Sequence, residues 1–204
     1  MRKSMPESVP LDPRTLMNAY AKGLFPMANR SGVIQWFTAD PRGVIPLESF
    51  HLPGTLRALI RKSPAEGGFE MRINHDFESA MRACREKRTG GTWINEQLIE
   101  AYIRLHKIGM AHSVEAWKEG KLVGGLYGVS LGAAFFGESM FHRARDASKV
   151  ALVHLVNRLR ERGFVLLDTQ ATTPHLRQFG CIDIPAADYL RQLKSAIKKD
   201  CEFD

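Results

Sequence analysis

The 204-residue chain carries 29 Lys and Arg against 22 Asp and Glu, a formal net charge of +7 that favours a polyanionic partner such as nucleic acid. No apolar run approaches the roughly 20 residues that span a bilayer, and residues 1–10 are too polar for a signal peptide, so we expect a cytoplasmic protein. The three cysteines, Cys84, Cys181 and Cys201, are far apart and form no CxxC pair, which argues against a zinc site or a disulfide framework.

The first third of the chain predicts a helix followed by short strands. Asp12 and Pro13 start a helix that ends at Gly23, residues 33–37 and 44–45 read as strands around a turn at 40–43, and residues 53–62 read as a short helix. Residues 63–68 are the best linker in the chain. We therefore predict a small N-terminal domain, residues 1–64, and a larger domain, residues 65–204.

The second part predicts a mixed α+β domain. A strand at 69–73 precedes helices at 76–87 and 95–108, and then three strands at 111–118, 121–130 and 133–140 are joined by turns at 119–120 and 131–132 as an antiparallel meander. A helix at 148–162, a buried strand at 164–169, a short helix around His175, a strand near Ile182 and a helix at 188–199 complete the chain. This element order is that of the acyl-CoA N-acyltransferase superfold.

Two stretches concentrate groups that can carry chemistry. Residues 137–149 place Glu138, hydroxyls and cations at the end of a strand, where Asp146 or Ser148 caps the next helix, and the uncapped N–H groups of such a helix attract anions. Asp168 ends an apolar strand, and Gln170 lies two residues further on, so both side chains are expected on one side. A carboxylate there is costly unless it is paired or works in catalysis. Two structural alternatives stay open at this point: residues 137–149 could be a helix cap with charged neighbours, and Asp168 could lie exposed at the end of its strand.

The basic residues gather in four groups, and the first three below are candidates for nucleic-acid contacts. The third group below lies in a loop after a strand, whereas the others lie on or just after helices, where a solvated face is the ordinary explanation. The groups are Arg57, Arg61 and Lys62; Arg82, Arg85, Lys87 and Arg88; Arg143 and Arg145; and Arg158, Arg160 and Arg162.

Nearly the whole chain, from about Leu11 to Leu190, resembles the leucyl/phenylalanyl-tRNA–protein transferase family, whose motifs occur here in the family's order. They are Gly23-Leu24-Phe25-Pro26, Trp36-Phe37-Thr38-Ala39-Asp40-Pro41-Arg42, Gly91-Thr92-Trp93-Ile94, Ala101-Tyr102-Ile103-Arg104-Leu105-His106, Ala111-His112-Ser113-Val114-Glu115-Ala116-Trp117, Leu122-Val123-Gly124-Gly125-Leu126-Tyr127-Gly128-Val129, Gly137-Glu138-Ser139-Met140-Phe141, Ala147-Ser148-Lys149, Leu167-Asp168-Thr169-Gln170 and Pro174-His175-Leu176. The chain departs from the family pattern at Phe37, Thr38, Ala39, His142 and Thr169.

The resemblance implies an acyltransferase-like domain with a small N-terminal domain. It implies transfer of leucine or phenylalanine, and also methionine, from tRNA to proteins that begin with Arg or Lys, which marks them for N-end-rule degradation. It implies no metal and no cofactor, because the ester is already activated. We expect a monomer with no membrane partner.

The same resemblance assigns the site residues. Asp168 is the carboxylate that orients the acceptor amine and takes its proton directly or by relay, Gln170 holds its geometry, and Glu138 attracts the acceptor's cationic side chain or orders the site. The aminoacyl pocket is expected to be apolar and, with leucines at two helix positions that can be phenylalanine, to favour leucine. Its residues are Trp36, Trp93, Met140, Leu155, Leu159 and Leu167, although the two helix leucines also suit a core at i and i+4.

Two other functions compete with this interpretation. An acetyl-CoA-dependent N-acetyltransferase would need a glycine-containing pyrophosphate loop, whereas residues 143–149 contain no glycine. A non-catalytic tRNA-binding module would have no need of Asp168, Gln170 and Glu138 together.

Overall fold

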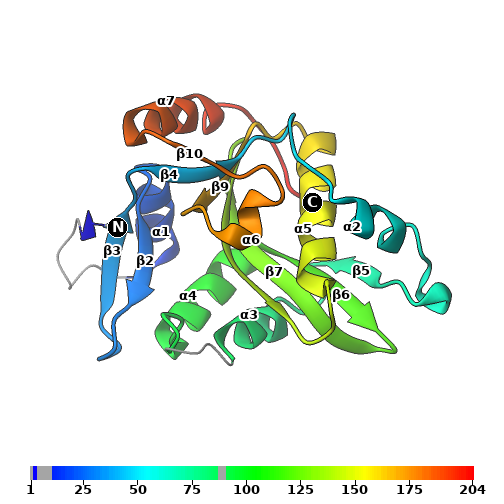
Figure 1. Ribbon diagram of the computed structural model, residues 1–204. Coiled ribbons are helices and arrows are strands. Elements are labelled where there is room, and N and C mark those ends of the chain that lie inside the picture. The colour runs from blue at the N-terminus through cyan, green and yellow to red at the C-terminus, as the bar shows by residue number, and fades with distance from the viewer. Residues whose placement is uncertain (1, 4–10, 87–90) are drawn as a thin grey trace.

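The computed structural model describes residues 2–3, 11–86 and 91–204 of the chain. Its strands form two sheets, and the helices cover both faces of the larger sheet (Figure 1). Lys87 and Arg88, two of the candidate basic residues, lie outside the described residues.

The smaller sheet is built from the N-terminal part of the chain. It has the order β1 (Arg2–Lys3), β3 (Ile34–Thr38), β2 (Phe25–Ala28), with antiparallel pairing throughout. Helix α1 (Pro13–Tyr20) lies between β1 and β2 in the chain, and the Asp12 side chain caps this helix by accepting a hydrogen bond of 3.0 Å from the Thr15 amide. The sequence did not predict β2, because Pro26 interrupts it and proline removes a ladder donor.

The larger sheet has seven strands in the order β10-β4-β9-β8-β7-β6-β5. Its central meander is confirmed, and every neighbouring pair is antiparallel except β8 and β9. The strands are β4 (Arg42–Ile45), β5 (Glu70–Ile73), β6 (Ala111–Lys118), β7 (Lys121–Leu131), β8 (Ala134–His142), β9 (Leu166–Gln170) and β10 (Ile182–Ile184).

Two apolar cores lie on the two faces of this sheet, because successive strand residues point to opposite sides. Phe136 and Leu166 belong to the core under α3 and α4, whereas Phe135 and Leu167 belong to the core under α5. The expected α+β architecture of acyltransferase type, a mixed sheet with flanking helices, is therefore confirmed. The helices are α2 (Gly54–Leu59), α3 (Phe77–Arg85), α4 (Glu96–Lys107), α5 (Ala147–Glu161), α6 (Pro174–Arg177) and α7 (Ala186–Ala196).

The segment expected to be a linker is a short 3-10 helix, η1 (Pro64–Glu66), with a reciprocal cap between Ser63 and Glu66. The chain belongs to the layers of the larger sheet on both sides of this helix: before it β4 pairs with β9 and α2 contacts α5, and after it β5 pairs with β6. We propose that the division between the two parts lies near Pro41, where the chain leaves the smaller sheet, rather than at residue 64.

No helix in the described part of the chain is long and apolar enough to cross a membrane.

Candidate active site

A cavity of about 580 Å³ lies where the smaller sheet meets β8, β9 and the first turns of α5. It brings together residues from the N-terminal part, the meander and the segment after β9. Its lining is Phe25, Met27, Trp93, Leu126, Tyr127, Gly137, Glu138, Ser139, Met140, His142, Ser148, Leu152, Leu155, Leu167, Thr169, Gln170, Ala171, Thr173, His175 and Leu176.

Two irregularities in the sheet place polar residues at this cavity. The pairing of β7 with β8 shifts register so that Glu138 has no direct partner between Gly137 and Ser139. The pairing of β4 with β9 shifts in the same way at Thr169, and Gln170 then adopts a positive φ of 59°. Such bulges redirect side chains, and they are common beside active sites.

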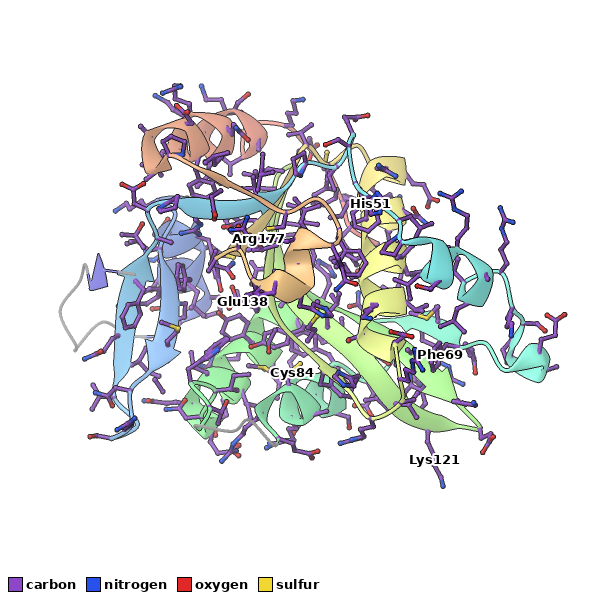
Figure 2. All side chains as sticks on the ribbon, in the orientation of Figure 1. His51, Phe69, Cys84, Lys121, Glu138 and Arg177 are labelled. Carbon is purple, nitrogen blue, oxygen red and sulfur yellow. The ribbon has the colours of Figure 1, made fainter. Side chains whose placement is uncertain are left out.

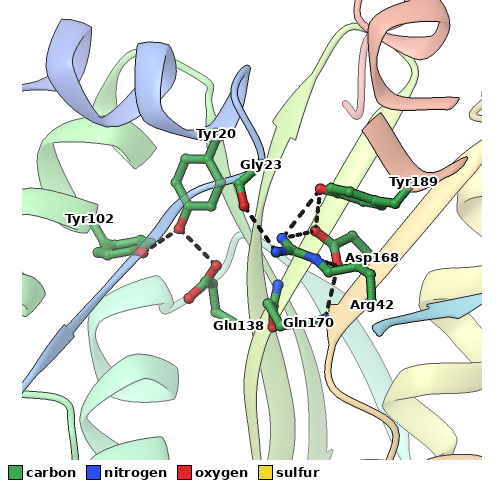
Figure 3. Close-up of polar contacts among 8 residues, drawn as sticks. All are labelled: Tyr20, Gly23, Arg42, Tyr102, Glu138, Asp168, Gln170 and Tyr189. Atoms are coloured by element: carbon green, nitrogen blue, oxygen red, sulfur yellow. Dashed lines mark hydrogen bonds and ion pairs between the residues drawn. The ribbon is translucent and has the colours of Figure 1, made fainter. Parts of the chain in front are cut away.

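Glu138 is half-buried in the cavity wall and belongs to a network of hydroxyl groups (Figure 3). The Tyr20 hydroxyl donates to Glu138 Oε1 over 2.7 Å and also shares a short hydrogen bond with the Tyr102 hydroxyl. Burial raises the pKa of Glu138 to about 7, and the charge of Asp168 adds to the effect, while the tyrosine hydroxyls and Arg42 oppose it. Glu138 therefore titrates close to neutral pH, as a general acid or base should.

Asp168 forms a fully buried ion pair with Arg42 (Figure 3). Arg42 Nε donates to Asp168 Oδ1 over 2.9 Å, and Arg42 Nη2 donates to Oδ2 over 2.6 Å. The Tyr189 hydroxyl also donates to Oδ2, over 2.7 Å, and the third guanidinium nitrogen donates to the Gly23 carbonyl. Burial alone would lower the pKa of Arg42, but the neighbouring Asp168 raises it, so the guanidinium stays charged.

Gln170 connects this ion pair to the cavity. Its backbone N–H donates to Asp168 Oδ1 over 2.8 Å, and its side chain lines the cavity with Nε2 buried and without a partner among the described residues. Asp168 is not among the lining residues of the described chain, and both of its oxygens already accept two hydrogen bonds. Asp168 thus lies behind Gln170 and does not face the space where a substrate would bind.

The structure places most of the predicted apolar pocket at this cavity. Trp93, Met140, Leu155 and Leu167 line it, together with unpredicted residues of which Met27 and Leu152 are examples. Trp36 and Leu159 lie instead in the core, with exposures of 1% and 0%. Leu159 lies one helical turn beyond Leu155, roughly 6 Å further along α5, and so leaves the cavity.

The sequence reasoning missed the groups that hold the carboxylates. These groups come from four different elements: Arg42, Tyr189, Tyr20 and Tyr102. In the sequence they could be noticed only because they belong to the family motifs or to the apolar faces of helices. His142, one of the departures from the family pattern, is exposed, ends β8 and lines the cavity.

The basic groups differ in their surroundings. Arg82 and Arg85 pair with Glu96, and Arg143 pairs with Glu86 over 2.8 Å. Arg158 and Arg160 donate to backbone carbonyl groups of Phe203 and Leu47, so they hold the fold together. Arg57, Arg61 and Lys62, on and after α2, are exposed and form no ion pair with an acidic side chain of the described residues.

In the described residues, His, Cys, Asp and Glu side chains form no group of three that would hold a metal ion. What remains at the cavity is an apolar floor, an amide, and one carboxylate whose pKa is near neutral. This set suits the binding of an apolar acyl group and the deprotonation of an amine, the two tasks of an enzyme that transfers an acyl group to an amine.

The comparison with known families is consistent with that class and narrows it. Residues 44–194 match the model for leucyl/phenylalanyl-tRNA protein transferase, and residues 10–40 match the model for the N-terminal domain of the same enzyme. The chain belongs to the leucyl/phenylalanyl-tRNA protein transferase family and is an aminoacyltransferase whose substrates are an aminoacyl-tRNA and a protein.

Two curated relatives are similar over almost their whole length. The leucyl/phenylalanyl-tRNA–protein transferase of Rubrobacter xylanophilus is 50% identical over 194 residues, covering 95% of this chain and 98% of that protein. The enzyme of the same name from Paramagnetospirillum magneticum is 50% identical over 199 residues, covering 96% and 93%.

Among solved structures, a ribosomal-protein-alanine N-acetyltransferase from Brucella melitensis is 17% identical with a TM-score of 0.38, covering 54% of this chain and 85% of that one.

Proposed function

We propose that this enzyme transfers leucine, phenylalanine or methionine from aminoacyl-tRNA to the N-terminal α-amine of proteins that begin with Arg or Lys. The product carries an apolar N-terminal residue, which marks the protein for N-end-rule degradation in the cytoplasm. One observation carries the proposal: a single cavity combines an apolar floor with the partly protonated carboxylate of Glu138.

The apolar floor suits the aminoacyl side chain. Met140, Leu155 and Leu167 bring no charge to the cavity, so the side chain of Asp or Lys would lose its hydration there without a partner. Discrimination among apolar side chains is expected to be shallow, because one methylene contributes only about 1–3 kcal/mol.

The polar end suits the acceptor amine. In the reaction the amine nitrogen attacks the ester carbonyl, a peptide bond forms, the ester bond to the tRNA ribose breaks, and one amine proton ends on the released ribose hydroxyl. We assign Glu138 as the group that takes the proton, since among the carboxylates of the described chain it is the one that lines the cavity. Its negative charge also attracts a cationic first residue.

Gln170 and Asp168 take the supporting roles. The side-chain oxygen of Gln170 accepts a hydrogen bond from the amine and orients it. Asp168 acts as a positioning residue, because it holds the Gln170 backbone and the Arg42 guanidinium from behind.

The test uses radiolabelled Leu-tRNA and three model proteins that differ only in beginning with Arg, Lys or Asp. We expect transfer to the first two and little to the third. Equal transfer to all three would refute the acceptor preference. Retention of tRNA without transfer would favour a binding module, and acetyl-CoA turnover would favour an acetyltransferase.

A further inference from the structure

The cavity continues beyond Met140 into a group of polar side chains that the proposed reaction leaves without a role. His142 ends β8, Ser148 lies in the first turn of α5, and His175 lies in α6. All three line the cavity, and we call them the Ser148 subsite. Glu138 and His142 are four residues apart on one strand, so this subsite lies roughly 13 Å along β8 from the acidic end.

Two atoms of the Ser148 subsite are free to bind a ligand. The Ser148 side chain is 97% buried, faces the cavity, and has no hydrogen bond with another residue of the described chain. His175 Nε2 is buried and likewise lacks a partner in the described part of the chain. A buried polar atom without a partner costs free energy, so His175 Nε2 favours a ligand that supplies one, and Ser148 Oγ lines the same cavity beside it.

The start of α5 adds a positive electrostatic potential. Helix α5 is 15 residues long, and Asp146, which precedes it, makes no side-chain capping bond. The Asp146 carboxylate is instead paired with Lys149 over 2.7 Å and with Arg145 over 3.5 Å. The Ala147 N–H already donates to the Ala144 carbonyl over 3.2 Å, so the helix dipole and the remaining N–H groups of the first turn are what favours an anion, with the hydroxyl of Ser148 beside them.

Gly124 fixes this helix start against the sheet. It is paired with His142, and a Cβ at this position would lie 2.4 Å from the Ala147 Cβ. The first turn of α5 is thereby held beside the end of β8 and at the mouth of the same cavity.

The two ends of the cavity thus have opposite character. The acidic end suits an amine, and the Ser148 subsite, which offers hydrogen-bond donors and a helix N-terminus, suits a phosphate. We propose that the Ser148 subsite binds the phosphate on the 5′ side of the terminal nucleoside of the aminoacyl-tRNA, with hydrogen bonds from Ser148 Oγ and His175 Nε2. This inference rests on aminoacyl-tRNA being the donor, as proposed above.

The test measures binding rather than transfer, so that it does not depend on the reaction. Two stable compounds are titrated by calorimetry: 3′-leucylamido-3′-deoxyadenosine and its 5′-phosphate. The proteins are wild type, Ser148→Ala and His175→Ala, with Ser195→Ala and His51→Ala as matched controls at exposed positions.

Wild type and both controls should bind the phosphorylated compound about tenfold more tightly, as expected for hydrogen bonds to a charged group. In Ser148→Ala and His175→Ala the ratio should fall toward one, while the unphosphorylated compound still binds. The ratio is taken within each protein, so a general loss of stability cancels.

Equal affinity of wild type for the two compounds, or a preference that both variants retain, would overturn the proposal. Absence of binding by either compound would overturn it as well. A phosphate preference that depends on Ser148, in a protein that fails to transfer leucine to Arg-starting proteins, would leave this inference standing and refute the proposed acceptor.

Discussion

Asp168 and Glu138 are two carboxylates in one site whose surroundings assign them different work. Asp168 is completely buried, paired with Arg42 and fully hydrogen-bonded, so its side chain is held in one position. Glu138 borders the cavity and has a pKa raised by burial. Two carboxyl groups in such different surroundings are typical of sites in which one group positions its neighbours and the other transfers a proton.

For Asp168→Ala we predict a fall in transfer of about 10²–10⁴-fold, because the Gln170 backbone loses its anchor and Arg42 is left buried without a counter-ion. The unpaired Arg42 should also lower the free energy of unfolding by about 3–5 kcal/mol. The measurement is kcat and KM for Leu-tRNA, and KM should change little because tRNA binding is nearly intact.

The matched control is Asp183→Ala, which removes an exposed pair with Arg177 and should alter neither quantity much. The more conservative Asp168→Asn keeps the side-chain volume and tests the charge alone. Transfer by Asp168→Ala within twofold of wild type would rule out the positioning role.

The raised pKa of Glu138 makes the stability of the protein depend on pH. In the folded protein the Glu138 carboxyl keeps its proton up to about pH 7, whereas in the unfolded chain it loses the proton near its ordinary pKa of 4.5. Between these two pH values the unfolded state binds fewer protons than the folded state. The free energy of unfolding therefore falls as pH rises through this range. Glu138→Gln cannot ionise. The difference in unfolding free energy, variant minus wild type, should therefore rise from pH 5 to pH 8 in chemical denaturation, and a difference that does not change with pH would contradict the assignment.

At the scale of elements, the site depends on how β7, β8 and α5 meet. Gly124 is needed because α5 packs so closely that a Cβ would also lie 2.9 Å from the Ala147 carbonyl carbon. An added methyl group must push the first turn of the helix away, and the cavity loses its defined end.

We predict that Gly124→Ala lowers the free energy of unfolding by about 1–3 kcal/mol and lowers transfer. Gly54→Ala at the start of α2 is the matched control, since an added Cβ there meets nothing within 4 Å. Denaturant unfolding of both variants provides the comparison. Equal stability of the two would show that α5 can shift without cost.

The elements themselves were largely predictable from the sequence, because hydrophobic periodicity and turn residues mark them locally. The β6–β7 turn, for example, lies at Glu119 and Gly120 as expected, and Gly120 adopts the positive φ that glycine favours in such a turn. The site was less predictable. Asp168 could be recognised as a carboxylate at the end of an apolar strand. Its partner Arg42 lies 126 residues away, and no local sequence pattern predicts such a pair.

Bulges in the sheet explain the remaining differences between the predicted and the observed site. An unbroken strand would place Asp168 and Gln170 on one side, but the shift at Thr169 and the positive φ of Gln170 break the alternation. Bulge positions depend on the partner strand, so the sequence of one strand does not show them. The same reasoning applies to Glu138 in β8.

At the scale of the whole molecule, the net charge of +7 should act through cations that are not already neutralised. Arg57 and Arg61 on and after α2 are exposed and lack a carboxylate partner within the described chain, whereas Arg82 pairs with Glu78 and Glu96. We therefore expect tRNA binding to depend on the first two more than on the third.

We predict that tRNA affinity falls several-fold or more for each doubling of salt, as for about six phosphate contacts. The double change Arg57→Ala and Arg61→Ala should reduce the slope of log affinity against log salt by about two, and Arg82→Ala should change it little. Filter binding at several salt concentrations gives these slopes. A flat salt dependence in wild type would mean that the basic groups are only a solvated face.

The amino acid carried on the tRNA is proposed to bind in the cavity that Met140 lines. The measurement that tests this proposal most directly is a competition between Leu-tRNA and Phe-tRNA on wild type and on Met140→Ala. The shortened side chain enlarges the cavity, and the phenylalanine ring fills part of the new space better than leucine does, so we predict that the Leu-to-Phe transfer ratio falls by several-fold, within the range of about 1–3 kcal/mol per methylene. Leu159→Ala, a core change outside the cavity, should leave the ratio unchanged. A ratio that is the same in wild type and Met140→Ala would mean that Met140 only packs the core and that the amino acid binds elsewhere.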